Sequence, residues 1–253
     1  MRNLLRTMIV GVLALFALAT LSACSGGSST TSTSSEASSS SATSTSAATA
    51  PSATSTSAAA AAPTPFPASA RYMADMVSDD GKKMAIGISV DGDQVTAYAC
   101  NGVDDEAWFF GNQTDGTIDI PNKFRDTLAA SFNGTDLTGD LTMNGTKYAF
   151  TAAAVSAPAG MYTADLDGAR ASWIVRPDGS VTGVQFNGGI SGRDFEQAEQ
   201  QQLNAAQFQS QVRNKRILQQ ADQQISIQNG TLTSKINGRT VTGKLVTGTT
   251  RFS

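Results

Sequence analysis

Tight-turn dipeptides constrain the fold of this chain more than any other feature. From residue 71 onward, Asn-Gly or Asp-Gly recurs in "SDDGK", "VDGDQ", "CNGVD", "TDGT", "FNGT", "MNGT", "PDGS", "QNGT" and "INGR". These dipeptides supply the positive φ values that two-residue hairpin turns require. The runs between them are short and rich in β-branched and aromatic residues, as in "MAIGISV" and "QVTAYAC". The pattern predicts a mainly β fold made of antiparallel meanders.

Several of these runs occur twice, in the same order. The three pairs are "YMAD" at 72–75 with "YTAD" at 162–165, "VDGDQVTAYACNG" at 90–102 with "RPDGSVTGVQFNG" at 176–188, and "FNGTDLTGDL" at 132–141 with "INGRTVTGKL" at 236–245. Repeated landmarks indicate one structural unit used twice. We therefore expect two tandem β-meander repeats, 70–157 and 158–253, that pack together or form one barrel-like body. The alternative is that any meander reuses Asn-Gly turns.

One segment of the second repeat does not fit the strand pattern. The tyrosine motifs lie 90 residues apart and the last pair of motifs 104 apart, which indicates an insertion of about 14 residues. Residues 193–222 contain no Gly or Pro and many Gln, and Asp194 is placed to cap a helix. The segment predicts one long Gln-rich α-helix, about 45 Å if continuous.

The N-terminus reads as a targeting segment. Arg2 and Arg6 precede the apolar run "MIVGVLALFALATL", which is short for a membrane span, and residues 1–23 have the layout of a secretory signal peptide. "LSAC" at Leu21–Cys24 resembles the bacterial lipobox, in which the cysteine is lipidated and becomes the mature N-terminus. This resemblance implies that Cys24 anchors the protein to the outer face of the cell membrane. The alternative is an ordinary signal peptide with a cysteine near its cleavage site.

Residues 24–69 consist almost entirely of Ser, Thr and Ala, with a few prolines. Such a segment has too little apolar surface to fold, and we expect a disordered tether with a typical end-to-end distance of roughly 35–40 Å. A lipobox followed by such a tether is similar to uncharacterised secreted lipoproteins of actinobacteria, mycobacteria included. The resemblance implies a location in the cell envelope and identifies no catalytic residues.

Charge is divided unevenly between the predicted repeats. Residues 71–157 carry 13 acidic and 6 basic side chains, a net charge of −7, and residues 158–253 carry 7 acidic and 10 basic, a net charge of +3. Opposite signs favour docking of the two repeats on one another. The basic surplus is too small and dispersed for a nucleic-acid site.

The composition excludes several catalytic sites. The chain has no histidine, which removes Ser-His-Asp and Cys-His sites and the commonest zinc ligand. It has no nucleotide-binding glycine motif. We expect no catalytic residue, no cofactor and no metal site. Cys100, left without a partner if Cys24 is lipidated, is expected to be a buried apolar residue.

Three hypotheses for function follow from the sequence. The first is a non-enzymatic, lipid-anchored envelope protein that binds a partner protein or an apolar or lipid ligand; its membrane contact is Cys24. The second is a secreted carbohydrate-active hydrolase that uses carboxylates of Asp104–Glu106. The third is a scaffold or sensor subunit that engages a membrane protein through the Gln-rich helix. The candidate ligand or partner contacts are Trp108, Phe109, Phe110, Trp173, Phe208 and Val212.

Overall fold

The computed structural model describes residues 64–252. The predicted signal peptide, Cys24 and almost all of the predicted tether lie outside the described residues. The elements, in chain order, are β1 (Ser69–Val77), β2 (Lys83–Asp91), β3 (Gln94–Cys100), β4 (Glu106–Thr114), β5 (Thr117–Pro121), β6 (Thr127–Phe132), β7 (Leu137–Met143), β8 (Thr146–Ala154), β9 (Gly160–Leu166), β10 (Ala169–Val175), β11 (Val181–Phe186), α1 (Gly192–Gln200), α2 (Ala205–Gln211), the 3₁₀ turn η1 (Arg213–Lys215), β12 (Leu218–Gln220), β13 (Ser226–Gln228), β14 (Thr231–Ile236) and β15 (Arg239–Leu245). The prediction of a mainly β fold is confirmed.

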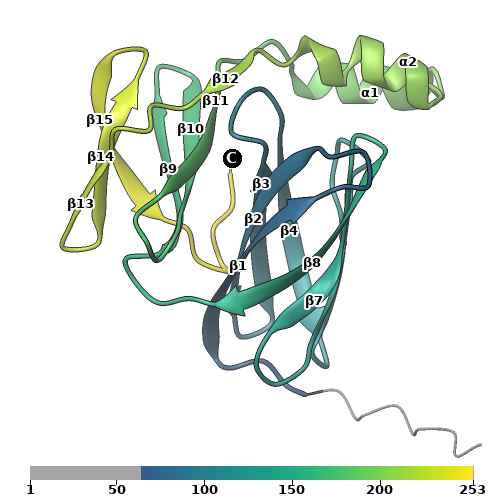
Figure 1. The fold of residues 1–253 in the computed structure, drawn as a ribbon. Helices are drawn as coiled ribbons and strands as arrows, with labels where there is room; N and C mark the ends of the chain where they lie inside the picture. Colours follow the sequence, from purple (N-terminus) through teal and green to yellow (C-terminus); the bar gives the residue numbers. More distant parts are fainter. Residues whose placement is uncertain (1–63, 253) are drawn as a thin grey trace, which may run out of the picture. The chain divides into compact units, whose positions relative to one another are not determined.

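The first eight strands form a closed antiparallel barrel (Figure 1). Each strand pairs with its neighbour in the chain, and β8 returns to pair with β1, where Tyr72 lies opposite Ala154. Strand β6 alternates exposed and buried residues along its whole length, as expected for a sheet with one buried face. Large side chains fill the interior, among them Ile88, Phe109 and Leu128, each at most 1 % exposed.

The remaining seven strands form a second, curled sheet that does not close. Its order is β12-β11-β10-β9-β15-β14-β13, so the two three-residue strands β12 and β13 are its edges. The concave face holds an apolar cluster that includes Tyr162, Trp173 and Leu232. This sheet is therefore a half-barrel.

Corresponding strands of the barrel and the half-barrel pair in the same register. In the barrel Tyr72 lies opposite Ile88 on one side and Ala154 on the other. In the half-barrel Tyr162 lies opposite Trp173 and Leu245. The strands β9, β10 and β15 thus occupy the positions that β1, β2 and β8 occupy in the barrel.

The predicted equivalence of "FNGTDLTGDL" and "INGRTVTGKL" is wrong: the two sequences belong to hairpins that differ by one position in the strand order. "FNGT" joins β6 to β7, whereas "INGR" joins β14 to β15, the position that "MNGT" occupies between β7 and β8. Asn237 and Asn144 both have φ +51 and are followed by a positive-φ glycine, while Asn133 has no positive φ. Asn-Gly turns encode only local geometry, so they do not distinguish successive hairpins.

When "INGR" is matched with "MNGT", the predicted 14-residue insertion disappears. Tyr72 to its partner Ala154 is 82 residues, and Tyr162 to its partner Leu245 is 83 residues. The half-barrel is therefore longer by one residue and not by 14. Its helices take chain length that the barrel uses for β5 and for most of β4, because β12, which occupies the position of β4, has only three residues.

The prediction of one long helix over 193–222 is wrong. The segment forms two short helices and a 3₁₀ turn, and then the strand β12. Gln202 adopts φ +49, which ends the first helix, and the Asn204 side chain accepts a hydrogen bond from the Gln207 backbone N–H and starts the second. The fold into two helices gives their sparse apolar residues a small core of their own, formed by Ala198, Leu203, Phe208 and Val212 against Phe124, Ile190 and Phe195.

The outer face of the barrel packs against the half-barrel. Their shared apolar cluster includes Tyr98 and Trp108 from the barrel and Met161, Ile174 and Val184 from the half-barrel. Gly87 permits close approach here, because a Cβ at this position would lie 2.5 Å from Cγ of Met161.

Candidate functional site

Ion pairs between the barrel part of the chain, residues 64–157, and residues 158–252 all have the same polarity. Every such pair within residues 64–252 joins an arginine after residue 157 to a carboxylate before it: Arg170 with Glu106, Arg176 with Asp75, Arg213 with Asp105 and Asp126, and Arg216 with Asp105. This is the arrangement that the uneven charge of the sequence predicts.

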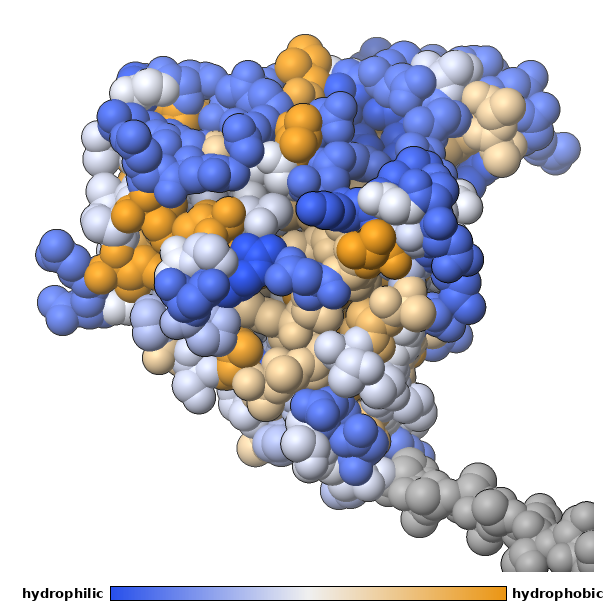
Figure 2. All heavy atoms as spheres, viewed as in Figure 1, coloured by the Kyte–Doolittle hydropathy of each residue, from blue (hydrophilic) through white to orange (hydrophobic). Residues whose placement is uncertain are grey.

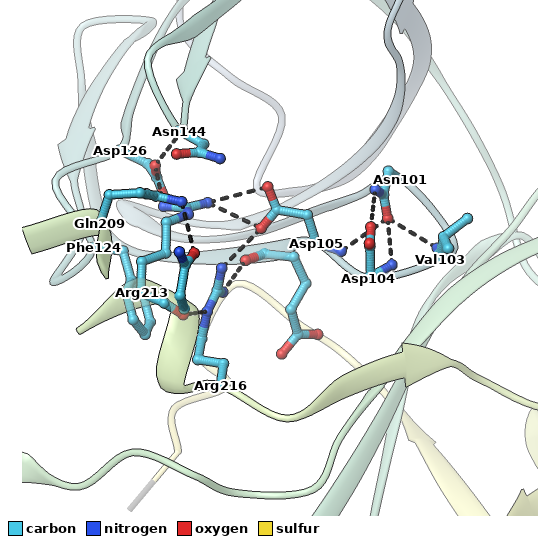
Figure 3. A network of polar contacts seen from close by, with 12 residues as sticks. Asn101, Val103, Asp104, Asp105, Phe124, Asp126, Asn144, Gln209, Arg213 and Arg216 are labelled. Atoms are coloured by element: carbon cyan, nitrogen blue, oxygen red, sulfur yellow. Dashed lines mark hydrogen bonds and ion pairs between the residues drawn. The ribbon is translucent and has the colours of Figure 1, made fainter. Parts of the chain in front are cut away.

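Four of these residues, Asp105, Asp126, Arg213 and Arg216, form what we call the arginine–aspartate cluster (Figure 3). Arg213 donates to Oδ1 of Asp126 at 2.7 Å and to Oδ1 of Asp105 at 3.1 Å. The side chains of Arg213 and Asp126 are only 3 % and 2 % exposed. Water cannot solvate charges so deeply buried, so each charge is stabilised by its ionic and hydrogen-bonding partners in the protein.

Arg216 completes the cluster. It donates to Oδ1 of Asp105 at 2.8 Å and to the carbonyl oxygen of Glu106 at 2.7 Å, and its guanidinium lies 4.4 Å from the ring centre of Phe124. Asp105 follows β3 and Phe124 follows β5, so both lie in loops at one end of the barrel. The cluster therefore fixes the helical segment, residues 192–216, to that end of the barrel.

Glu106 lies deeper, in the core between the sheets. It is 3 % exposed and accepts a hydrogen bond from Arg170 at 2.8 Å. Burial raises the pKa of Glu106 above its usual range, although Arg170 acts in the opposite direction. Its second oxygen, Oε2, and Nε1 of Trp108 are buried and have no hydrogen-bond partner among the described residues.

The three predicted carboxylates Asp104, Asp105 and Glu106 do not form one reactive group. Asp104 is exposed and accepts from the Asn101 side chain at 2.9 Å within a loop. Asp105 is held by two arginines and Glu106 by a third. A glycosidase needs two carboxylates on either side of a substrate-filled gap, one of them free to transfer a proton. The observed geometry offers the hydrolase hypothesis little support.

The six predicted contact residues are dispersed over four apolar clusters. Phe109 lies inside the barrel, Trp108 and Phe110 lie between the sheets, Trp173 lies inside the half-barrel, and Phe208 and Val212 lie in the helical core. All except Phe110 are at most 9 % exposed. The structure gives these aromatic residues a packing role and does not bring them to one cleft.

Cys100 is buried in the core between the sheets, as expected. Burial raises the pKa of its thiol to about 12. The thiol therefore stays protonated at neutral pH and is a poor nucleophile.

The described residues offer two further negative findings. No cluster of three or more His, Cys, Asp or Glu side chains within 64–252 is arranged to hold a metal ion. None of the helices in that range has the length and apolar character needed to span a membrane.

The residues that sequence reasoning missed are Asp126, Arg213 and Arg216. The uneven charge of the two halves indicated that they attract one another, but it did not identify which arginine pairs with which aspartate.

Comparison of the chain with protein-family models, curated proteins and solved structures found no match.

Proposed function

We propose that this protein is a lipid-anchored binding protein of the bacterial cell envelope that acts without catalysis. In this proposal Cys24 holds the chain on the outer face of the membrane, and the helical segment engages a partner protein. One observation carries the proposal: buried ion pairs fix the helical segment to the barrel while its outward face stays exposed and rich in glutamine.

The outward face of the helical segment is rich in amide side chains, interspersed with Arg193, Glu196, Glu199 and Lys215. Exposed residues on its helices and on the turn between them include Gln197, Gln200, Gln201, Gln207 and Gln211. Figure 2 shows hydrophilic residues gathered over this part of the molecule. A rigid surface loses little conformational entropy on binding, and its glutamines shed water at lower cost than its charged side chains do. Both properties favour a protein partner.

The apolar-ligand form of the hypothesis has less support. The barrel interior is filled by large side chains such as Tyr72, Ile88 and Leu141, and Phe66 stacks on Phe132. A lipid carrier needs an apolar cavity, whereas a closed eight-stranded barrel is just wide enough for its own side chains. We therefore favour a protein partner over a lipid.

The proposed anchor is tested by replacing the lipidated residue. We expect Cys24→Ser to move the protein from the membrane fraction to the soluble fraction, and to abolish metabolic labelling with a fatty-acid analogue. Retention of both label and membrane association in this variant would refute lipidation at Cys24.

The proposed surface is tested with substitutions that spare the fold. In the full-length protein, Gln197→Lys, Gln200→Lys and Gln211→Lys together change the charge of the exposed face. They leave intact the arginine–aspartate cluster and the Gln207 side chain that caps α2. A matched control places three lysines on exposed barrel positions, Ser131, Thr135 and Thr151. Cross-linking in intact cells should recover the same membrane or envelope protein from the wild type and the control but not from the glutamine variant. Equal recovery from all three would refute this surface.

A further inference from the structure

The half-barrel has a hollow on its open side, at a site separate from the proposed partner surface. Strand β12 pairs only with β11, and β13 pairs only with Thr231–Thr233 of β14. The second half of β14, Ser234–Ile236, therefore lacks a strand on that side. In the barrel, β5 fills the corresponding gap between β4 and β6. In the half-barrel only the connection 221–225 crosses it.

Hydrogen bonds hold that connection in place at two adjacent residues, Ala221 and Asp222. The carbonyl oxygen of Asp222 accepts hydrogen bonds from Nε1 of Trp173 at 2.8 Å and from Oγ of Ser234 at 3.2 Å. The backbone N–H of Ala221 donates to Gly183 at 3.0 Å. The connection is thus a fixed wall of the hollow.

The hollow, which we call the amide pocket, has a volume of about 420 Å³. Carboxamide side chains dominate its lining: Gln185, Gln219, Gln220, Gln223 and Asn237, with Ala221, Asp222, Lys235 and Gly238 between them. The lining carries one positive and one negative side chain and little apolar surface. Pockets of this size hold small organic molecules.

The floor of the amide pocket is already ordered. Gln185 is 2 % exposed, and its Nε2 donates to Oδ1 of Asn187 at 2.7 Å and to Oδ1 of Asn237 at 2.8 Å. Both hydrogens of this amide are therefore used. No donor among the described residues contacts its Oε1, so the floor presents a hydrogen-bond acceptor in a fixed direction.

We propose that the amide pocket binds a neutral, hydroxyl-rich ligand, a short stretch of an uncharged oligosaccharide. A hydroxyl group both donates and accepts. The exposed carboxamides of Gln219, Gln220 and Gln223 each offer a donor and an acceptor side by side, and Gln185 adds its Oε1 as an acceptor. The balanced charge of the lining favours an uncharged ligand, and the scarcity of apolar surface disfavours a lipid. The ordered amides at the floor lower the entropy lost on binding.

The proposal is tested by calorimetric titration of the full-length protein, purified in detergent, with neutral oligosaccharides of glucose, mannose, arabinose and N-acetylglucosamine. We expect at least one of them to bind. Asn237→Gly then removes a pocket carboxamide, and because Asn237 has φ +51, glycine preserves the turn. Loss of about one neutral hydrogen bond should raise the Kd about fivefold.

The chain offers a matched control. Asn229 has the same φ of +51 in the preceding hairpin turn and lies outside the pocket lining, so Asn229→Gly should leave the Kd unchanged. Gln223→Ala, at an exposed position of the lining, should weaken binding as Asn237→Gly does.

Three outcomes would overturn the proposal. The first is that none of the four oligosaccharide classes binds. The second is binding that both asparagine variants weaken equally. The third is that an extended Ser/Gly peptide binds in an Asn237-dependent manner and the sugars do not, which would make the pocket a peptide site.

Discussion

For single residues, burial decides how much an ion pair contributes to stability. Arg213 and Asp126 are almost fully buried, so Arg213→Met leaves a carboxylate in the core without its cation. We expect this variant to lose about 3–5 kcal/mol of unfolding free energy, measured by urea denaturation. The exposed pair of Arg239 with Asp167 is the control, because those side chains are 60 % and 71 % exposed. Arg239→Met should cost less than about 1 kcal/mol.

If Arg213→Met and Arg239→Met lose similar amounts of unfolding free energy, the arginine–aspartate cluster is not the anchor of the helical segment. Asp126→Asn provides a second measurement that keeps shape and removes charge. It should also destabilise, because Arg213 then loses its closest ionic partner, at 2.7 Å.

Cys100 provides a test of packing between the sheets. Because its thiol is buried and its pKa is raised to about 12, we expect no reaction with iodoacetamide at pH 8 in the folded protein. Peptide mapping by mass spectrometry should find the label on Cys100 only after denaturation. A Thr249→Cys variant, exposed in the structure, is the positive control. Rapid labelling of Cys100 under native conditions would mean that the interface opens readily.

Among the elements, helix α1 has a predictable pH response. Asp194 accepts from Nζ of Lys215 at 2.6 Å and from the backbone N–H of Ser191 at 2.8 Å. The Lys215 ammonium and then Ser191 lower the pKa of Asp194 to about 2. An aspartate of lowered pKa stabilises the fold above its unfolded pKa of about 4, and this contribution is lost as the pH falls towards 2.

Hydrogen exchange of the α1 amides measures this response. Protection should fall between about pH 4 and pH 2 in the wild type, after correction for the intrinsic exchange rate. In Asp194→Asn the fall should be absent and protection should be low throughout. An identical pH profile in both proteins would contradict this role of Asp194.

The sequence predicts individual elements well where the signal is local. Turn dipeptides predicted the hairpins, and Asp115, Asn144, Asn229 and Asn237 do adopt positive φ ahead of glycines, whereas Asn101, Asn133 and Asp178 do not. The helical segment was predicted at the right place with the wrong length. Its break depends on Gln202 in the left-handed region, which glutamine composition does not reveal.

The candidate site was less predictable, because it depends on partners far apart in the chain. Arg213 and Asp126 are separated by 87 residues, and nothing near either of them identifies the other. Trp108 and Trp173 were predicted as ligand or partner contacts, yet both lie in apolar cores. The amide pocket depends on the absence of one strand, which appears only when the two registers are compared.

For the whole molecule, the question is whether the two sheets are stable independently. Their shared core includes Tyr98, Trp108 and Ile174, which are at most 9 % exposed, and separation would expose these side chains to water. Ion pairs of uniform polarity add to this interface. The cost of exposing so many apolar side chains is large compared with the stability of a typical domain.

We therefore predict that barrel and half-barrel unfold in one step. Amides of β7 and β14, in different sheets, should show the same free energy of opening in native-state hydrogen exchange. Ile174→Ala removes interface side-chain volume and should lower both values equally, by about 2–5 kcal/mol. Val241→Ala, inside the half-barrel, is a control that acts on the same cooperative unit from outside the interface, so it too should lower both values. If β14 opens at a lower free energy than β7, or if Val241→Ala affects β14 alone, the half-barrel is a separate folding unit, and its pocket can be studied without the barrel.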